Sequence, residues 1–105
     1  MATLITIGGY EFTAHPEDGK AFTLRELQGY VGGYIERIGL PDGTSMYVNE
    51  EGLLERLAHN RRASELASPH YVVGQVIICT DAEIGEDEED GWPPDADMVI
   101  AQENN

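Results

Sequence analysis

The amino-acid sequence predicts an α+β protein: a small mixed, mainly antiparallel sheet of about five to six strands, with two main helices packed on one face. Two observations predict this class. Short apolar, β-branched runs alternate with glycine-containing turns, as in antiparallel hairpins. Helix-start signals stand at Thr23 and Asn49. With 105 residues and a single cysteine, one hydrophobic core without an intramolecular disulfide is expected.

The N-terminal third predicts a hairpin followed by a helix. Residues 3–7 and 10–13 are short strand-forming runs joined at Gly8-Gly9. Thr23 and Glu26 have the spacing of a capping box, in which each side chain bonds the other residue's backbone N–H. The helix is predicted to end at Gly32-Gly33, because glycine readily adopts the left-handed conformation of a C-terminal cap.

A second hairpin and a second helix are predicted next. Residues 34–40 and 44–48 are strand-like and flank the turn residues 41–43, Pro-Asp-Gly. Asn49 is then a favourable N-cap, with carboxylates following in the first helical turn. The predicted buried stripe of this helix is Leu53, Leu54, Leu57 and Ala58.

The following segment is expected to be irregular and then strongly apolar. Asn60 is predicted to break the second helix, and residues 63–67 to form a short turn. Residues 71–80 form an almost unbroken apolar run, which favours a central strand covered on both faces.

The predicted division of the chain is a compact α+β domain at residues 1–80 and an acidic loop and C-terminal segment at 81–105, returning as an edge strand at 98–101. Residues 1–80 hold ten acidic and six basic residues, whereas residues 81–105 hold ten acidic residues and no basic one. The net charge of the chain is −14. Direct nucleic-acid binding is not expected, because it needs Lys and Arg to displace counterions. The balance favours a cationic partner surface, a metal ion or solubility alone.

The N-terminus lacks the pattern of a secretory signal, and no apolar run reaches the ~20 residues of a membrane helix.

A recognisable pattern of residues runs through about Leu24–Cys79. It consists of Val31-Gly32-Gly33-Tyr34-Ile35-Glu36, Asn49-Glu50-Glu51-Gly52, Asn60, Ala63, Leu66 and Gly74. This pattern resembles a family of small proteins of unknown function from bacteriophages, plasmids and actinobacterial genomes, and it leaves the acidic segment outside. The resemblance implies a mobile-element accessory protein that acts in the cytoplasm of a bacterial host, and it transfers no catalytic residue.

The acidic run is the first candidate site. It fails as an EF-hand loop starting at Asp81, because the sixth position is Glu86 rather than Gly and the twelfth is Trp92 rather than Glu. A solvated loop is one interpretation. The sharper one is a docking surface that imitates phosphates for a basic host protein, formed by Asp81, Glu83, Glu86, Asp87, Glu88, Glu89, Asp90 and Trp92.

The second candidate is a pocket between the sheet and the two helices that binds a small molecule or nucleotide. Its predicted lining is Tyr34, Tyr47, Asn49, Arg56 and Arg61. The arginines are also placed to complement a helix end and pair with nearby glutamates.

No catalytic, metal or cofactor site is expected. Glu50 and Glu51 are adjacent, so on a helix they point about 100° apart and do not converge on one atom. The three histidines lack metal-pair spacing, and Cys79 is interpreted as a core thiol. The leading hypothesis is therefore a non-catalytic, anti-defence type protein that occludes a basic, nucleic-acid-binding surface of a host protein. The alternative is the small-molecule module, and a homo-oligomer is left open.

Overall fold

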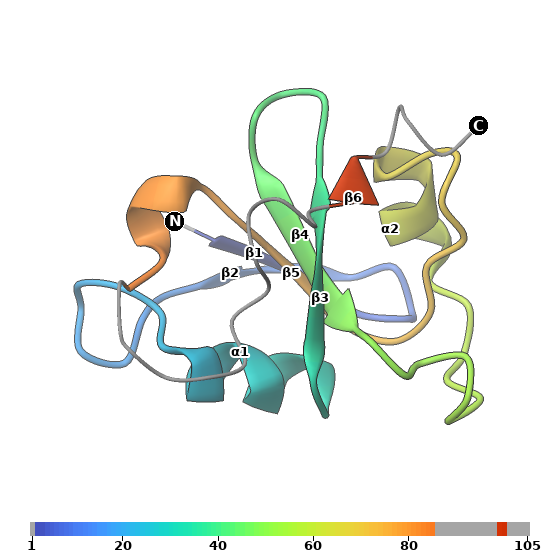
Figure 1. Ribbon diagram of the computed structural model, residues 1–105, viewed down its shortest axis with the longest axis horizontal. Coiled ribbons are helices and arrows are strands. Elements are labelled where there is room, and N and C mark those ends of the chain that lie inside the picture. Colours follow the sequence, from blue (N-terminus) through green and yellow to red (C-terminus); the bar gives the residue numbers. More distant parts are fainter. Residues whose placement is uncertain (1, 86–98, 101–105) are drawn as a thin grey trace.

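The computed structural model describes residues 2–85 and 99–100. These residues form a six-stranded sheet in the order β2-β1-β5-β4-β3-β6 (Figure 1). In chain order the elements are β1 (Ala2–Ile5), β2 (Glu11–Ala14), α1 (Leu24–Val31), β3 (Ile35–Gly39), β4 (Ser45–Asn49), α2 (Arg61–Leu66), β5 (Val76–Cys79), a 3-10 turn (Asp81–Glu83) and β6 (Val99–Ile100). Neither helix in this part of the chain has the length and apolarity that crossing a bilayer requires.

The sheet is mainly antiparallel. The pairs β1–β2, β1–β5, β4–β5 and β3–β4 are antiparallel, and β6 joins β3 in parallel with Val99 opposite Ile38. The predicted α+β class is therefore confirmed. β5 lies between β1 and β4, the central position that its apolar sequence predicted. β6 falls within 98–101, where a returning edge strand was expected.

The two faces of the sheet carry separate hydrophobic clusters, because successive residues of a strand point to opposite sides. On β4, Tyr47 belongs to one cluster and its neighbour Met46 to the other. On β5, Ile77 and Val76 divide in the same way. Both faces are therefore covered.

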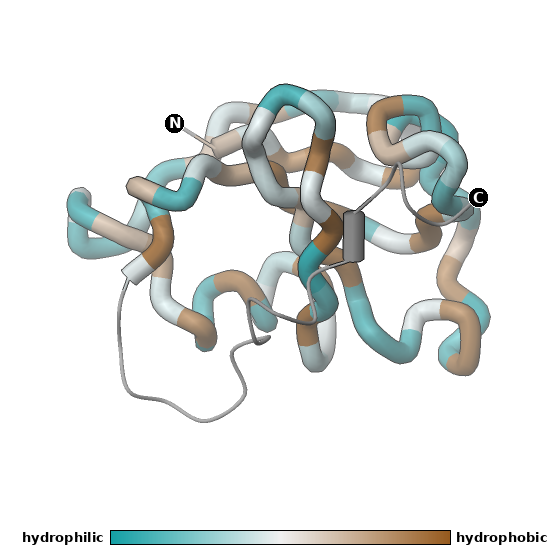
Figure 2. Tube along the Cα trace, turned by 45° about the horizontal axis from the view of Figure 1, so that its top comes forward, coloured by the Kyte–Doolittle hydropathy of each residue, from teal (hydrophilic) through white to brown (hydrophobic). Residues whose placement is uncertain are grey.

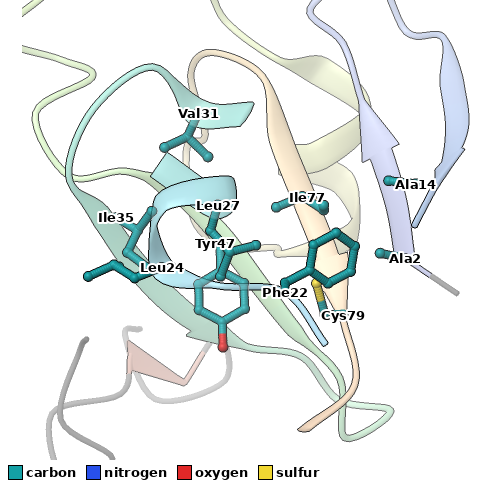
Figure 3. Packing of buried hydrophobic residues seen from close by; sticks show 10 residues of the cluster. All are labelled: Ala2, Ala14, Phe22, Leu24, Leu27, Val31, Ile35, Tyr47, Ile77 and Cys79. Atoms are coloured by element: carbon teal, nitrogen blue, oxygen red, sulfur yellow. The ribbon is translucent and has the colours of Figure 1, made fainter. Parts of the chain in front are cut away.

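Each helix covers a different face. α1 contributes Leu24, Leu27 and Val31 to the cluster that contains Tyr47, and we call this side the α1 face (Figure 3). α2 contributes Ala63 to the cluster on the other side, the α2 face. Figure 1 shows the two helices on opposite sides of the strands. The expectation that two helices pack on one face is not confirmed.

The caps of α1 follow the local sequence. The Thr23 hydroxyl accepts the Glu26 N–H at 3.1 Å, and the Glu26 carboxylate accepts the Thr23 N–H at 2.9 Å. Gly32 has a φ of 83° and donates its N–H to the Gln28 carbonyl at 2.8 Å. The predicted capping box and glycine cap are confirmed, as are the two predicted hairpins.

The helix predicted after Asn49 is wrong, because the chain completes only one helical turn there. The Leu57 N–H donates to the Gly52 carbonyl at 3.0 Å, and the Arg56 N–H donates to the Leu53 carbonyl at 3.1 Å. This pair of bonds is the Schellman motif that ends a helix. Arg56 has the left-handed φ of 57° that the motif requires at its turning residue.

The early turn leaves Leu53, Leu54 and Ala58 of the predicted stripe exposed, whereas Leu57 is half-buried. Leu53 is 69% exposed and Leu54 is 81% exposed, although both were predicted to be buried. Hydrophobic residues at the tip of this loop are visible at the lower right of Figure 2. The leucines therefore contribute apolar surface rather than core.

Asn60 begins a helix instead of breaking one. Its Oδ1 accepts the Ala63 N–H at 3.0 Å, which caps α2 in the segment predicted to be a short turn. Its Nδ2 donates to the Ile5 carbonyl at 3.1 Å and to the Gly74 carbonyl at 2.8 Å. One fully buried side chain thus ties α2 to the end of β1 and to the segment before β5.

Candidate functional site

A groove of about 340 Å³ lies on the α2 face. Its wall is formed by β3, the end of β4, the loop of residues 50–57 and the segment that leads to β5. We call it the acidic groove, and its lining is Glu36, Ile38, Val48, Asn49, Glu50, Glu51, Gly52, Leu53, Leu54, His70, Tyr71, Val72 and Val73.

The loop that forms one wall is held by the carboxamide of Asn49. Its Oδ1 accepts the Glu51 N–H at 2.8 Å. Its Nδ2 donates to the Val31 carbonyl and to the Glu55 carboxylate, each at 3.2 Å. Because Asn49 is buried, this loop is anchored to the end of α1 rather than free in solvent.

Two glycines let the loop lie directly on the segment before β5. A Cβ at Gly52 would lie 2.7 Å from Val73 Cγ2, and one at Gly74 would lie 2.8 Å from Leu57 Cδ1. Gly74 also has a φ of 79°, which side chains disfavour. Side chains that pack directly on glycine backbone therefore shape the groove.

The groove brings two glutamate carboxylates and one histidine together. Burial raises the pKa of Glu36, the nearby Glu50 charge raises it further, and His70 lowers it. Arg61 and Arg62 pair with Glu65 and Glu11, which do not line the groove. A cation placed here would offset the cost of burying the Glu36 charge and the repulsion between Glu36 and Glu50.

An aromatic ring stands at the rim of the groove. Tyr71 is 64% exposed, and its ring stacks on that of His59 with centroids 4.4 Å apart and planes at 3°. His59 is in turn hydrogen-bonded to the Ser64 hydroxyl at 3.1 Å. A supported ring beside carboxylates is a favourable contact for a planar cation such as a guanidinium.

The described residues do not provide a metal centre. Among them, no group of three or more His, Cys, Asp or Glu side chains is placed to hold a metal ion. Cys79 is buried and free, and burial raises the pKa of its thiol to about 12. This confirms that Cys79 is a core thiol and makes it a poor nucleophile.

Only two of the predicted partner-binding residues lie in the described part of the chain. Asp81 and Glu83 form the 3-10 turn after β5, where the Glu83 carboxylate accepts the Thr80 N–H at 2.8 Å. The Glu83 carboxylate therefore caps the backbone of its own turn. The others lie outside the described residues: Glu86, Asp87, Glu88, Glu89, Asp90 and Trp92.

The residues predicted to line a small-molecule pocket do not converge. Tyr47 is fully buried on the α1 face, and burial raises its pKa to about 12. Tyr34 is 65% exposed before β3, Arg56 turns the exposed loop, and the Arg61 side chain is 87% exposed on α2. Of the five, only Asn49 lines the acidic groove.

Sequence reasoning missed Glu36, Leu53, Leu54 and Tyr71 as groove residues. Glu36 lies within the strand-like residues 34–40, but the opposite wall of the groove comes from a loop that had been predicted as helix. Gly52 and Gly74 gave a usable signal in the sequence, because neither a helix nor a strand requires glycine at these positions. Both glycines mark the close contact that shapes the groove.

The fold and the groove define a small α+β protein with a concave acidic surface. The chain belongs to the family described as a domain of unknown function, DUF3846, whose match covers residues 5–102. No curated protein and no solved structure matches it significantly. The family of unknown function is therefore confirmed. Because the match includes residues 81–102, the expectation that the acidic segment lies outside the family is wrong.

Proposed function

We propose that this protein is a non-catalytic binding protein and that the acidic groove takes a cationic side chain from a basic protein surface. The observation that carries the proposal is the arrangement of Glu36 and Glu50 beside the supported ring of Tyr71 in one concavity. The carboxylates supply charge and hydrogen-bond acceptors, and the ring supplies a flat apolar contact.

Arginine fits this arrangement better than lysine. A guanidinium is planar, binds carboxylates through two parallel N–H groups, stacks on aromatic rings and is weakly hydrated. The free protein holds Glu36 partly buried next to the like charge of Glu50. Binding of a guanidinium removes that repulsion, so the groove gains more from a cation than an open surface carboxylate does.

A protein partner is favoured by the surroundings of the groove. Leu53 and Leu54 add exposed apolar side chains to the groove, which a protein surface can cover. Residues 81–105 add ten acidic residues and no basic one to the same chain. The matching partner is a basic, nucleic-acid-binding face, which this protein would occlude. The phage or plasmid origin that the resemblance implies makes a host protein of the bacterial cytoplasm the partner that we propose, in an anti-defence role.

A second candidate function is the binding of a small organic cation. It is favoured by the groove volume of about 340 Å³, which lies within the range of roughly 300–1,000 Å³ typical of ligand pockets. The carboxylate lining disfavours a nucleotide, whose phosphates carry the same sign of charge.

A peptide titration tests the groove directly. The probe is acetyl-Leu-Arg-Leu-amide, and its uncharged control is the same peptide with citrulline in place of arginine. We expect NMR shifts at Glu36, Glu50 and Tyr71 with the arginine peptide, and at least tenfold weaker binding by Glu36→Gln. Glu17→Gln, which removes one exposed charge elsewhere, should bind as the unaltered chain does. Equal binding of the two peptides, or shifts confined to other residues, would contradict the proposal.

A capture experiment separates the groove from the acidic run. Full-length protein, Glu36→Gln, and a full-length variant with residues 86–90 changed to Gln or Asn are used as baits in bacterial lysate. The proposal predicts a basic protein held by the first bait and weakened in both variants. Retention of the same protein by Glu36→Gln at unchanged strength would remove the groove from the interaction.

A further inference from the structure

A second surface lies far from the groove, along the outer edge of β2. β2 is at one end of the sheet, and within the described residues no strand pairs with its outer side. Residues 7–13 are all exposed. They include Phe12, 54% exposed, and Tyr10, 69% exposed. An edge of this kind presents backbone donors and acceptors together with apolar side chains.

The register of the β1–β2 ladder shows which backbone groups point outward. The Thr6 N–H donates to the Tyr10 carbonyl at 3.0 Å, so these two residues form a hydrogen-bonded pair. Hydrogen-bonded and non-hydrogen-bonded pairs alternate along an antiparallel ladder. Phe12, opposite Leu4, therefore bonds to β1, whereas Glu11 and Thr13 direct their N–H and C=O groups to the open edge.

The usual protection of an edge strand by charge is weak here. Glu11 is the one charged residue of β2, and its carboxylate accepts the Arg62 Nε–H at 2.9 Å. The strand therefore presents a locally neutral edge, although the whole chain carries a net charge of −14. A neutral edge can approach another strand without a large local repulsion.

We propose that β2 pairs antiparallel with β2 of a second copy of this chain, with Phe12 opposite its own counterpart. In this register the outward groups of Glu11 meet those of Thr13 in the second copy, and four backbone hydrogen bonds form across the two-fold axis. Phe12 occupies a non-hydrogen-bonded pair, where Cα atoms are about 4.5 Å apart and side chains are closest. Aromatic cross-strand pairs at such positions are stabilising.

The neighbouring registers are less favourable. Pairing centred on Glu11 places two carboxylates directly opposite each other. Pairing centred on Thr13 leaves Phe12 opposite the small side chain of Ala14. The proposed register also extends an existing cluster, because Phe12 lies beside Leu4, which packs against the hydrophobic cluster of the α1 face.

Salt distinguishes this contact from binding by the groove. Two copies that each carry −14 repel one another at long range, so screening by salt should strengthen the dimer. Binding of a cationic partner should instead weaken as salt rises. Failure of one proposal therefore leaves the other standing.

Disulfide trapping tests the register. In the full chain, Phe12→Cys places two thiols across the two-fold axis at a spacing that a disulfide can bridge. Tyr10→Cys is the matched control: Tyr10 is also exposed on the same hairpin, but the proposed register separates its two copies by roughly four residues, or about 13 Å. The native Cys79 is buried and contributes little background.

Under mild oxidation we expect a covalent dimer of Phe12→Cys several-fold faster than of Tyr10→Cys, and faster still at high salt. Equal rates for the two variants would overturn the register.

Sedimentation of the unaltered chain should show a mass that rises above the monomer value of 11.5 kDa with concentration. Thr13→Pro removes an outward donor and spares the bonds to β1, so it should hold the mass at the monomer value. A monomer at the highest soluble concentration of the unaltered chain would overturn the dimer itself.

Discussion

The α1 face and the α2 face cover the same sheet in different ways. On the α1 face a capped helix packs Leu24, Leu27 and Val31 against the strands. On the α2 face a six-residue helix and irregular segments are joined by the buried carboxamide of Asn60, and a groove remains. The difference indicates that the first layer serves stability, whereas the second combines a structural frame with an exposed, charged surface.

The largest expected effect is on the α2 face, at Asn60. Asn60→Ala removes three hydrogen bonds and leaves the carbonyls of Ile5 and Gly74 buried without that donor. We expect a loss of about 4 kcal/mol in the free energy of unfolding, measured by chemical denaturation. The matched change on the α1 face, Thr23→Ala, should cost about 1 kcal/mol. Equal losses would show that the two faces are not built differently.

Alkaline pH should act on the α1 face, where Cys79 and Tyr47 are buried. The pKa of Cys79 is raised from 9.0 to about 12 in the folded chain. An acid whose pKa is higher when folded contributes stability below its unfolded pKa and loses it as the pH rises toward the folded value. Between pH 9 and 11 this thiol alone should cost about 2 kcal/mol of the free energy of unfolding.

Urea denaturation across that pH range measures the loss. Cys79→Ala should flatten the pH dependence, leaving the smaller part due to Tyr47, whose pKa is raised from 10.0 to about 12. An unchanged slope in the variant would show that the thiol is not responsible.

Changing a glycine to alanine should have opposite effects on stability on the two faces. Gly52→Ala puts a Cβ 2.7 Å from Val73 Cγ2 in the groove wall, and we expect a loss of about 2 kcal/mol. Gly29 lies on the exposed side of α1, and a Cβ added there has no atom within 4 Å. Gly29→Ala should therefore raise the free energy of unfolding by about 0.5–1 kcal/mol. Thermal unfolding compares the two. Stabilisation by both would mean that the groove wall is looser than described.

The two faces also differ in how far the sequence predicts them. The caps of α1 depend on residues three or four positions apart, so Thr23, Glu26 and Gly32 could be interpreted locally. The α2 face depends on contacts across the chain: Asn60 reaches Ile5, 55 positions away. No local pattern encodes such a bond, and an asparagine before a helix has the same sequence signature whether or not its amide is also buried.

The candidate site was predicted less well than the fold, for the same reason. Leu53, Leu54 and Leu57 have helical spacing, and only the left-handed turn at Arg56 moves the first two to the surface. Glu36 becomes a groove residue only because that loop folds over the end of β4. The acidic run at 86–90 stays a prediction, since it lies outside the described residues.

The smallest expected change in stability belongs to Glu36, and it gives the most direct test of the groove as a binding site. Burial and the charge of Glu50 raise the pKa of Glu36, so its charged form is held at a cost that a cation would relieve. Thermal unfolding and the arginine-peptide titration should be measured at neutral pH on the unaltered chain and on Glu36→Gln. We predict that the variant is about 0.5 kcal/mol more stable and binds the peptide at least tenfold more weakly. Lower stability with unchanged binding would contradict the account.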